Sequence, residues 1–355
     1  MAQPHRLISA LFLLAFFRQC TGFFFTVNAP VAKPAAPSNV KLLILPGFGN
    51  DSVDYLLENS LVSSLQEQGW KPEQISVLPV ARADWLQVFL RGALDWKFWS
   101  ADAPPTRRAF SWYLARISQQ IQSLGEDEKV VLVGHSAGGW LGRAAIGFGS
   151  EDEDAPPVDL AKVAGIVTLG APNLSPPPGV MDMTRGALRI TNERFPGAYH
   201  APDVFYITAM GLSVKGEKQE RQSPLEPTSV KGFAFNSYEA VCGVGTTIGD
   251  GVVPQCAGHV EGAIQVGPLE GASSIFIGMA LHCIASLYSP YLVTFFLHLK
   301  LDLDGVLHSI NAPDSWYGSS GVIGRWHGPM LQQLLAKPQK SRNLQPFPFS
   351  IFQQP

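Results

Sequence analysis

A serine between glycines carries the clearest chemical signal in the sequence. Residues 134–138 read GHSAG, which matches the pattern G-x-S-x-G with Ser136 at its centre. The apolar run KVVLV comes directly before this motif, and a segment with helical character follows it at residues 140–146. A strand, a sharp turn and a helix in this order expose a serine hydroxyl above a sheet, and the glycines permit the turn. Ser136 is therefore the predicted nucleophile of an acyl-transfer reaction.

Such a nucleophile also needs hydrogen-bond donors for the oxyanion that forms when it attacks a carbonyl. The backbone N–H of Ala137, directly after the serine, is the first candidate. The second is the N–H of Phe48, in the PGFG sequence that follows the apolar run at residues 40–45. An ordinary turn at the end of a strand is the alternative interpretation of residues 46–49.

An orienting carboxylate is predicted at Asp250, within the sequence GDGVVP at residues 249–254. Flanking glycines and the apolar pair that follows place this residue in a tight turn late in the chain. A carboxylate there can fix the tautomer of a catalytic histidine. The alternative is an aspartate that only forms the turn.

The base is expected among the histidines after Asp250, because the order Ser, Asp, His is usual for a serine in this kind of turn. His308 sits in a short loop after apolar residues and is the predicted base. His259 follows Asp250 too closely to reach another strand end. The other candidates are His282 and His298, which lie in an apolar run, and His327, which is expected on a helix surface.

Strands that alternate with helical segments are predicted along the chain. Strands are expected at residues 40–45, 74–80, 129–133, 163–169 and 204–208, and helices at residues 51–68, 110–124 and 140–146. This order predicts an α/β fold with a mainly parallel sheet and helices on both faces. The aromatic-rich segment 84–99 is expected to pack in the core or against helices, with a ligand cage as the alternative. Residues 174–201 and 211–239 lack a clear period and are predicted to be loops or lid elements.

Composition excludes several classes of function. With 46% hydrophobic residues most of the chain is not disordered, and a net charge of −3 does not suggest a surface that binds nucleic acid. Four cysteines without paired C-x-x-C spacing argue against structural zinc. Cys242 and Cys256 are the pair close enough in sequence to suggest a disulfide.

Residues 1–39 are predicted to be a presequence and linker. The apolar run at residues 7–17 is too short for a bilayer span and precedes small residues suited to cleavage before Phe23, as in a signal peptide. The Pro- and Ala-rich stretch after it resembles a plastid transit segment. Entry into the secretory pathway and import into a plastid both remain open, with an N-terminal membrane anchor as the alternative. The folded domain is expected at residues 40–335 and a tail at residues 336–355.

The motifs occur in the same order as in lipase-like α/β-hydrolases of plants and algae, which the sequence resembles over most of residues 40–326. The matching sequences are LPGFGN at 45–50, GHSAGGWL at 134–141, LGAP at 169–172, GDGVVP at 249–254, DGVLH at 304–308 and NAPDSWYG at 311–318. Those proteins are similar in turn to GPI inositol-deacylase-like lipid-ester hydrolases. The resemblance implies the α/β-hydrolase fold, with Ser136 as nucleophile, Asp250 as acid and His308 as base. Asn173 departs from it, because a histidine often stands there in the family.

An apolar insert at residues 266–300 interrupts this resemblance. Residues 271–299 contain no Asp, Glu, Lys or Arg, and such a run exceeds the roughly 20 residues that span a bilayer. A single crossing would separate Asp250 from His308, although both must reach Ser136. We therefore expect the insert to be a retained intron in the gene model, with a re-entrant membrane hairpin as the alternative.

These observations together predict a serine hydrolase that cleaves the carboxylic ester of a lipid or other apolar substrate through an acyl-enzyme. No metal and no organic cofactor is implied. An acyltransferase with the same intermediate and a non-catalytic, membrane-associated protein of the same fold remain as alternatives. The expected partners are the ester substrate and, as an open alternative, a membrane surface; nucleic acid is not expected.

Overall fold

A computed structural model describes residues 35–149, 156–220, 227–261, 264–266, 298–312 and 314–336. The chain divides into Met1–Pro34 and Ala35–Pro355, and all described residues belong to the second unit. The predicted presequence up to residue 34, most of the tail and His282 lie outside the described residues.

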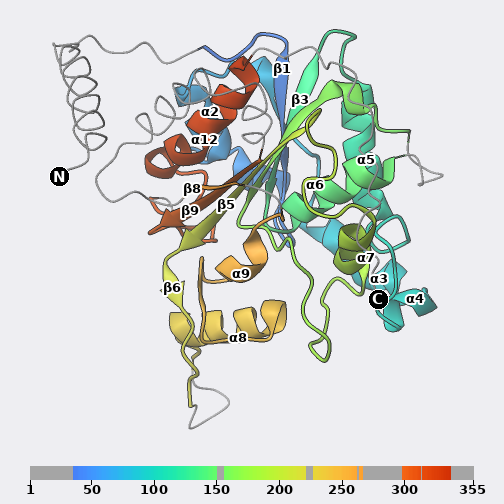
Figure 1. The fold of residues 1–355 in the computed structure, drawn as a ribbon, viewed down its shortest axis with the longest axis vertical. Helices are drawn as coiled ribbons and strands as arrows, with labels where there is room; N and C mark the ends of the chain where they lie inside the picture. The colour runs from blue at the N-terminus through green and yellow to red at the C-terminus, as the bar shows by residue number, and fades with distance from the viewer. Residues whose placement is uncertain are drawn as a thin grey trace, which may run out of the picture. The chain divides into compact units, whose positions relative to one another are not determined.

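A seven-stranded sheet in which every pairing is parallel forms the centre of the described chain (Figure 1). The strands in spatial order are β2 (Ile75–Val77), β1 (Val40–Leu45), β3 (Lys129–His135), β4 (Val163–Leu169), β5 (Phe205–Leu212), β9 (His298–Asp304) and β8 (Ile264–Val266). The prediction of an α/β fold with a mainly parallel sheet is confirmed. Because the strands are parallel, their carboxyl ends meet at one edge of the sheet.

Helices cover both faces of this sheet, as predicted. On one face lie α5 (Ser111–Gln122), α6 (Ala137–Phe148) and α7 (Ala187–Arg194), and on the other lie α2 (Leu61–Glu67) and α12 (Ser320–Leu335). Alternate residues of β1 pack into the two resulting cores, with Leu43 and Leu45 on the α6 side and Leu42 and Ile44 on the α12 side. Two buried faces explain why the central strands read as continuous apolar runs.

The region expected to form loops or lid elements holds regular structure beyond the sheet edge. β6 (Val214–Lys215) pairs antiparallel with β7 (Ile248–Gly249), and α8 (Val230–Cys242) and α9 (Gln255–Gly258) lie beside them. Of the two predicted forms, loops are therefore excluded for α7 and α8, and whether these helices act as lid elements stays a prediction. Few residues of α8 are buried, so its sequence carries a weak helical period.

Local departures from the predicted elements have identifiable causes. Residues 51–68 form η2 (Ser52–Tyr55) and α2 rather than one helix, and Asn59, with φ of 60°, lies between them. The short 3-10 helices η3 (Pro72–Gln74) and η6 (Leu160–Lys162) lead into β2 and β4.

The aromatic-rich segment forms η4 (Arg82–Trp85), α3 (Leu86–Gly92) and α4 (Trp96–Trp99). Its expected burial is only partly correct, because Phe89, Trp96 and Trp99 are exposed.

Both ends of the apolar insert belong to the sheet. β8 pairs with β9 through Ile264 with Leu299 and Val266 with Leu301. Residues 267–297 lie outside the described residues, so their origin stays a prediction. A deletion that leaves both strands intact removes residues 267–297 rather than 266–300. Within the described residues, no helix is long and apolar enough to cross a membrane.

Candidate active site

Ser136 lies in a sharp turn between β3 and α6, as the motif predicts. Its backbone has φ of 51° and ψ of −126°. This conformation is unfavourable for any residue other than glycine, and proteins typically keep it at functional sites. The Ser136 N–H donates to the carbonyl of Leu169 on the neighbouring strand (2.9 Å), which fixes the turn against the sheet. The turn therefore places the Ser136 hydroxyl at the carboxyl edge of the sheet.

Three glycines allow this turn to pack closely. A Cβ at Gly138 would collide with the carbonyl of Leu45, and one at Gly139 would collide with Ala171. At Gly134 an added Cβ would meet the backbone of α6. Each glycine is thus needed for the close contact between helix and strand.

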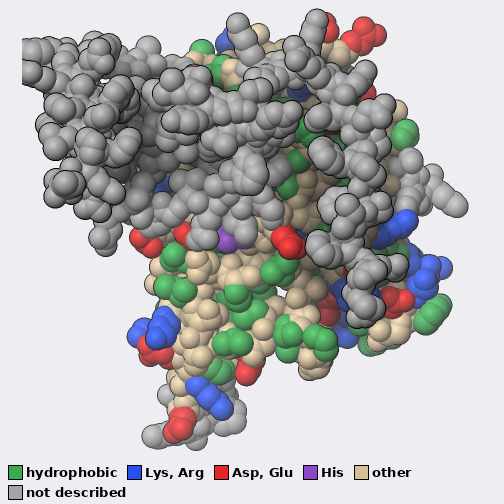
Figure 2. All heavy atoms as spheres, viewed as in Figure 1, with side chains coloured by type: hydrophobic (Ala, Val, Ile, Leu, Met, Phe, Trp, Pro, Cys, Tyr) green, Lys and Arg blue, Asp and Glu red, His purple; other side chains and the backbone are tan. Residues whose placement is uncertain are grey.

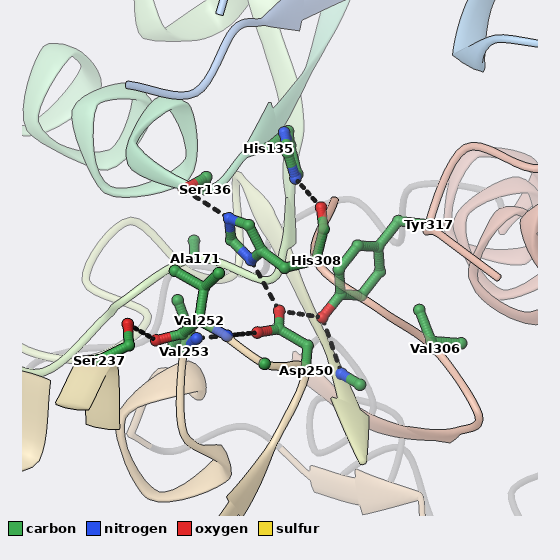
Figure 3. A network of polar contacts seen from close by, with 12 residues as sticks. His135, Ser136, Ala171, Ser237, Asp250, Val252, Val253, Val306, His308 and Tyr317 are labelled. Atoms are coloured by element: carbon green, nitrogen blue, oxygen red, sulfur yellow. Dashed lines mark hydrogen bonds and ion pairs between the residues drawn. The ribbon is translucent and has the colours of Figure 1, made fainter. Parts of the chain in front are cut away.

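The structure brings His308 and Asp250 to Ser136 from two separate loops (Figure 3). His308 Nε2 lies 3.0 Å from Ser136 Oγ, and His308 Nδ1 lies 2.8 Å from Asp250 Oδ2. The loops are also joined directly, because the His308 N–H donates to the Asp250 carbonyl (3.0 Å). These distances suit transfer of the serine proton to His308 while Asp250 orients the ring.

Asp250 is fully buried and receives four hydrogen bonds. The N–H groups of Val252 and Val253 donate to Oδ1, and His308 and the Tyr317 hydroxyl share Oδ2. Burial acts most strongly on the pKa of Asp250 and raises it, but the charge of His308 and these hydrogen bonds together outweigh burial. The pKa of Asp250 is therefore lowered, and the carboxylate stays ionised opposite His308.

Tyr317 is a member of this network to which the sequence analysis assigned no role. Its hydroxyl accepts from the Gly211 N–H (2.7 Å) and donates to Asp250 (2.8 Å). Burial, followed by the charge of Asp250, holds the pKa of Tyr317 well above its usual value, so the hydroxyl remains a donor. Tyr317 belongs to the NAPDSWYG sequence, but nothing in its local sequence reveals a contact with a distant loop.

His135, the residue before Ser136 in the motif, connects His308 to residues 46–49, the segment that contains Phe48. Its Nε2–H donates to the His308 carbonyl (3.1 Å), and its Nδ1 accepts from the Tyr55 hydroxyl (2.8 Å). The same hydroxyl accepts the N–H of Gly47 (3.0 Å). Burial, and then the nearby His308 charge, lowers the pKa of His135 to about 3, which keeps the ring neutral. This role was not predicted from the sequence.

The two predicted oxyanion donors belong to the serine turn itself and to the segment that packs against it. Ala137 begins α6, so its N–H is among those that a helix leaves without an intrahelical partner. Phe48 lies in a turn closed by the Asn50 N–H and the Gly47 carbonyl (3.0 Å), and Gly49 supplies the φ of 76° that this turn requires. An added Cβ at Gly47 would lie 2.8 Å from Ser136 Cβ, so this segment passes directly beside the nucleophile.

The other histidine candidates among the described residues lie away from Ser136. His259 contacts Asp302 and Thr208, and His298 begins β9 at the opposite end of that strand from the site. The expectation that His327 lies on a helix surface is wrong, because its buried Nε2 accepts from Trp70 Nε1 (2.8 Å). The helix α12 packs that face onto α2, which its sequence alone did not indicate.

No set of three or more His, Cys, Asp or Glu side chains within the described ranges could hold a metal ion. Cys242 and Cys256 are free thiols, so the suggested disulfide is absent from this structure.

Comparison with known proteins places the chain in a family. Residues 42–248 match the alpha/beta hydrolase family, and the chain belongs to it. The match covers Phe48, Ser136 and Ala137 but ends before Asp250 and His308. The sequence has no match among curated proteins.

Solved structures with a related arrangement are esterases, lipases and other enzymes. A metagenomic carboxyl esterase shares 11% identity, with 88% of this chain and 83% of that chain covered and a TM-score of 0.43. Lipase 1 from Pelosinus fermentans shares 11% identity, with 84% and 99% covered and a TM-score of 0.44. Tomato methylketone synthase I, solved with 2-tridecanone, shares 13% identity, with 84% and 97% covered and a TM-score of 0.29.

Proposed function

We propose that the protein is a serine hydrolase that cleaves a carboxylic ester through an acyl-enzyme. His308 takes the proton of Ser136 as the hydroxyl attacks the carbonyl, and Asp250 holds the imidazole in the required tautomer. The N–H groups of Phe48 and Ala137 stabilise the oxyanion. His308 then donates the proton to the leaving alcohol, and water activated by the same base releases the acid.

The observation that carries this proposal is the continuous hydrogen-bonded series from Ser136 through His308 to Asp250, with distances of 3.0 and 2.8 Å. Its nucleophile stands at the N-terminus of α6, where the helix dipole favours a developing negative charge. The strained backbone of Ser136 adds support, because such strain persists mainly where function requires it.

An apolar acyl chain is the substrate feature that we propose. Phe48 lies beside the nucleophile and is 51% exposed. Its ring contacts the exposed ring of Phe89, with 6.2 Å between the ring centroids. Hydrophobic side chains also gather beyond the sheet edge, over α8, in Figure 2. Val230 and Phe233 of α8 are both exposed. An apolar chain leaving the serine would therefore find hydrophobic contacts close by.

The direct test uses purified protein and p-nitrophenyl esters of increasing acyl length. We expect hydrolysis that improves with chain length, and Ser136→Ala should abolish it while the protein remains folded. Ser309→Ala is the matched control, because it removes an exposed hydroxyl next to His308 and should leave turnover unchanged. Equal activity of Ser136→Ala and wild type would refute the mechanism.

Acyl transfer to an alcohol is the second outcome that the same intermediate allows. Adding a primary alcohol to the assay and measuring the acyl products separates hydrolysis from transfer. Predominant ester formation at low alcohol concentration would identify an acyltransferase. A folded wild type that hydrolyses none of the esters would instead favour a non-catalytic protein of this fold.

We further propose that residues 1–39 direct the chain into the secretory pathway or, as a bipartite presequence, into a plastid of the plant or algal type. The proposal rests on the apolar run at residues 7–17 and the acid-free stretch after it. Mass spectrometry of the mature N-terminus tests it. A chain that begins at Phe23 or later supports cleavage, and retention of Met1 contradicts it.

A further inference from the structure

The segment of α3 and α4 is apolar on two opposite faces. Its inner face is already satisfied, because Val88 and Phe98 are buried in the core. Asp95, buried between the two helices, is held by two hydrogen bonds from Arg107 (2.6 and 2.8 Å). The segment is therefore firmly attached to the domain, and its outer face is a separate feature.

That outer face exposes six large hydrophobic side chains. They are Leu86, Phe89, Leu90, Leu94, Trp96 and Trp99, each more than half exposed. A helical segment that is apolar all round is normally covered on both sides. Contiguous exposed apolar surface of this kind marks an interaction site.

Basic side chains predominate around this face, because the exposed acid Asp102, in the loop after α4, is paired with Arg189. Within residues 86–100 the accessible charged side chains are Arg91 and Lys97, while the single acid, Asp95, is buried and paired. Arg108, in the loop after α4, is exposed as well. Figure 2 shows hydrophobic and basic side chains, with some acidic ones between them, at the lower right, where α4 lies in Figure 1. Tryptophan, leucine and basic residues together are the composition of a segment that lies in a membrane interface.

The outer face is continuous with the candidate active site. Phe89 of α3 contacts Phe48, and Phe48 follows Gly47, which packs against Ser136. We propose that the outer face of α3 and α4 docks onto a lipid surface with anionic headgroups, so that the ester substrate reaches Ser136 from the bilayer. Docking itself is independent of catalysis, whereas delivery of the substrate rests on the proposed ester hydrolysis.

The distribution of tryptophan makes docking directly measurable. Of the eight tryptophans, Trp96 and Trp99 are 69% and 63% exposed, and the other six are at most 7% exposed. Phospholipids brominated on their acyl chains quench tryptophan only on contact. Quenching therefore reports on Trp96 and Trp99 and not on other apolar parts of the chain, such as residues 7–17 or the insert.

The experiment mixes the full chain with brominated vesicles of equal parts phosphatidylcholine and phosphatidylglycerol. We expect strong quenching for wild type and loss of most of it for Trp96→Ser/Trp99→Ser. The matched control is Leu160→Ser, an exposed apolar residue before β4 at the opposite edge of the sheet, and it should quench as wild type does. Both tryptophans are exposed, so thermal unfolding should be unchanged in the double variant.

A second variant tests the charge argument without altering the tryptophans. Arg91→Gln/Lys97→Gln should weaken binding to the anionic vesicles by about 25-fold, because each basic residue near the surface contributes about fivefold. Binding to pure phosphatidylcholine vesicles should change little. Equal loss on both vesicle types would overturn the assignment to anionic headgroups.

Two results would overturn the docking surface itself. One is a wild-type protein that sediments with the vesicles without quenching of its tryptophans. The other is a dimer in solution that Trp96→Ser/Trp99→Ser dissociates, which would make this face a contact between two copies of the chain. Ser136→Ala should be quenched as wild type is, so failure of docking and failure of ester hydrolysis remain distinguishable.

Discussion

Two arrangements of hydroxyl, imidazole and carboxylate occur among the described residues, and their hydrogen-bond distances are nearly the same. Ser136, His308 and Asp250 form one, with distances of 3.0 and 2.8 Å. In the other, His259 lies 2.8 Å from Thr208 Oγ1 and 2.8 Å from Asp302. Both histidine side chains are 12% exposed, and both carboxylates are buried. Hydrogen-bond distances alone therefore do not distinguish a candidate site from a structural network.

The position of the hydroxyl distinguishes them. Thr208 is 1% exposed in the middle of β5, so its hydroxyl has no room to receive a substrate carbonyl. Ser136 stands in a strained turn at the N-terminus of α6, beside the Phe48 segment. The ring orientations also differ, because Nδ1 faces the carboxylate in His308 and Nε2 faces it in His259. Access and oxyanion donors, rather than the three polar groups, define the site.

Replacing each histidine gives the largest expected difference between the two arrangements. His308→Ala removes the general base and should lower kcat by about 10⁴ to 10⁶. His259→Ala should keep kcat within about tenfold of wild type, because the loss of His259 lowers the stability of the fold and does not touch the substrate. Steady-state hydrolysis of a soluble ester measures both. Loss of activity only in His259→Ala would reverse the assignment.

Replacing each carboxylate sharpens the same comparison. Asp250→Asn should lower kcat by about 10⁴, since the amide cannot hold the required tautomer of His308. Asp302→Asn should retain turnover but reduce the free energy of unfolding by roughly 1–3 kcal/mol, the cost of an impaired buried hydrogen bond. Ester hydrolysis and urea denaturation, applied to both variants, should show opposite patterns. Similar patterns would mean that the two networks have one role.

Removal of the Tyr317 hydroxyl should have an intermediate effect. Tyr317→Phe deprives Asp250 of one donor and the Gly211 N–H of its acceptor, so kcat should fall about tenfold to a hundredfold with KM nearly unchanged. Tyr206→Phe, which removes a mostly buried hydroxyl elsewhere, is the control and should keep wild-type kcat. A change in KM alone would argue that Tyr317 contacts substrate instead of positioning Asp250.

The smallest expected effect concerns His135 and pH. The pKa of His135 falls from 6.5 to about 3 on folding, so the unfolded chain takes up a proton below pH 6.5 while the folded chain does not. Its contribution to stability is thus complete above pH 6.5 and is lost as pH falls toward 3. Between pH 6.5 and 5 the loss is about 2 kcal/mol. His135→Asn should remove this part of the pH dependence in urea denaturation, and an unchanged slope would contradict the neutral buried ring.

The sequence predicted the elements whose signal is local. Continuous apolar runs identified β1, β3 and β4, and the glycines around Ser136 identified the turn, because both patterns arise from neighbouring residues. Tyr317, Tyr55 and His135 were missed because their partners are distant in sequence and meet only through tertiary packing. His327 was misplaced for the same reason, since its partner Trp70 lies on a different part of the chain.

The most direct test of the central claim is to identify which hydroxyl reacts with a fluorophosphonate probe. Such probes phosphonylate serines activated by a neighbouring base, so labelled protein can be digested and the modified residue located by mass spectrometry. We predict modification of Ser136, blocked in His308→Ala and retained in His259→Ala. Absence of labelling in a folded wild type, or labelling of a different residue, would contradict the assignment of Ser136, His308 and Asp250 as the active site.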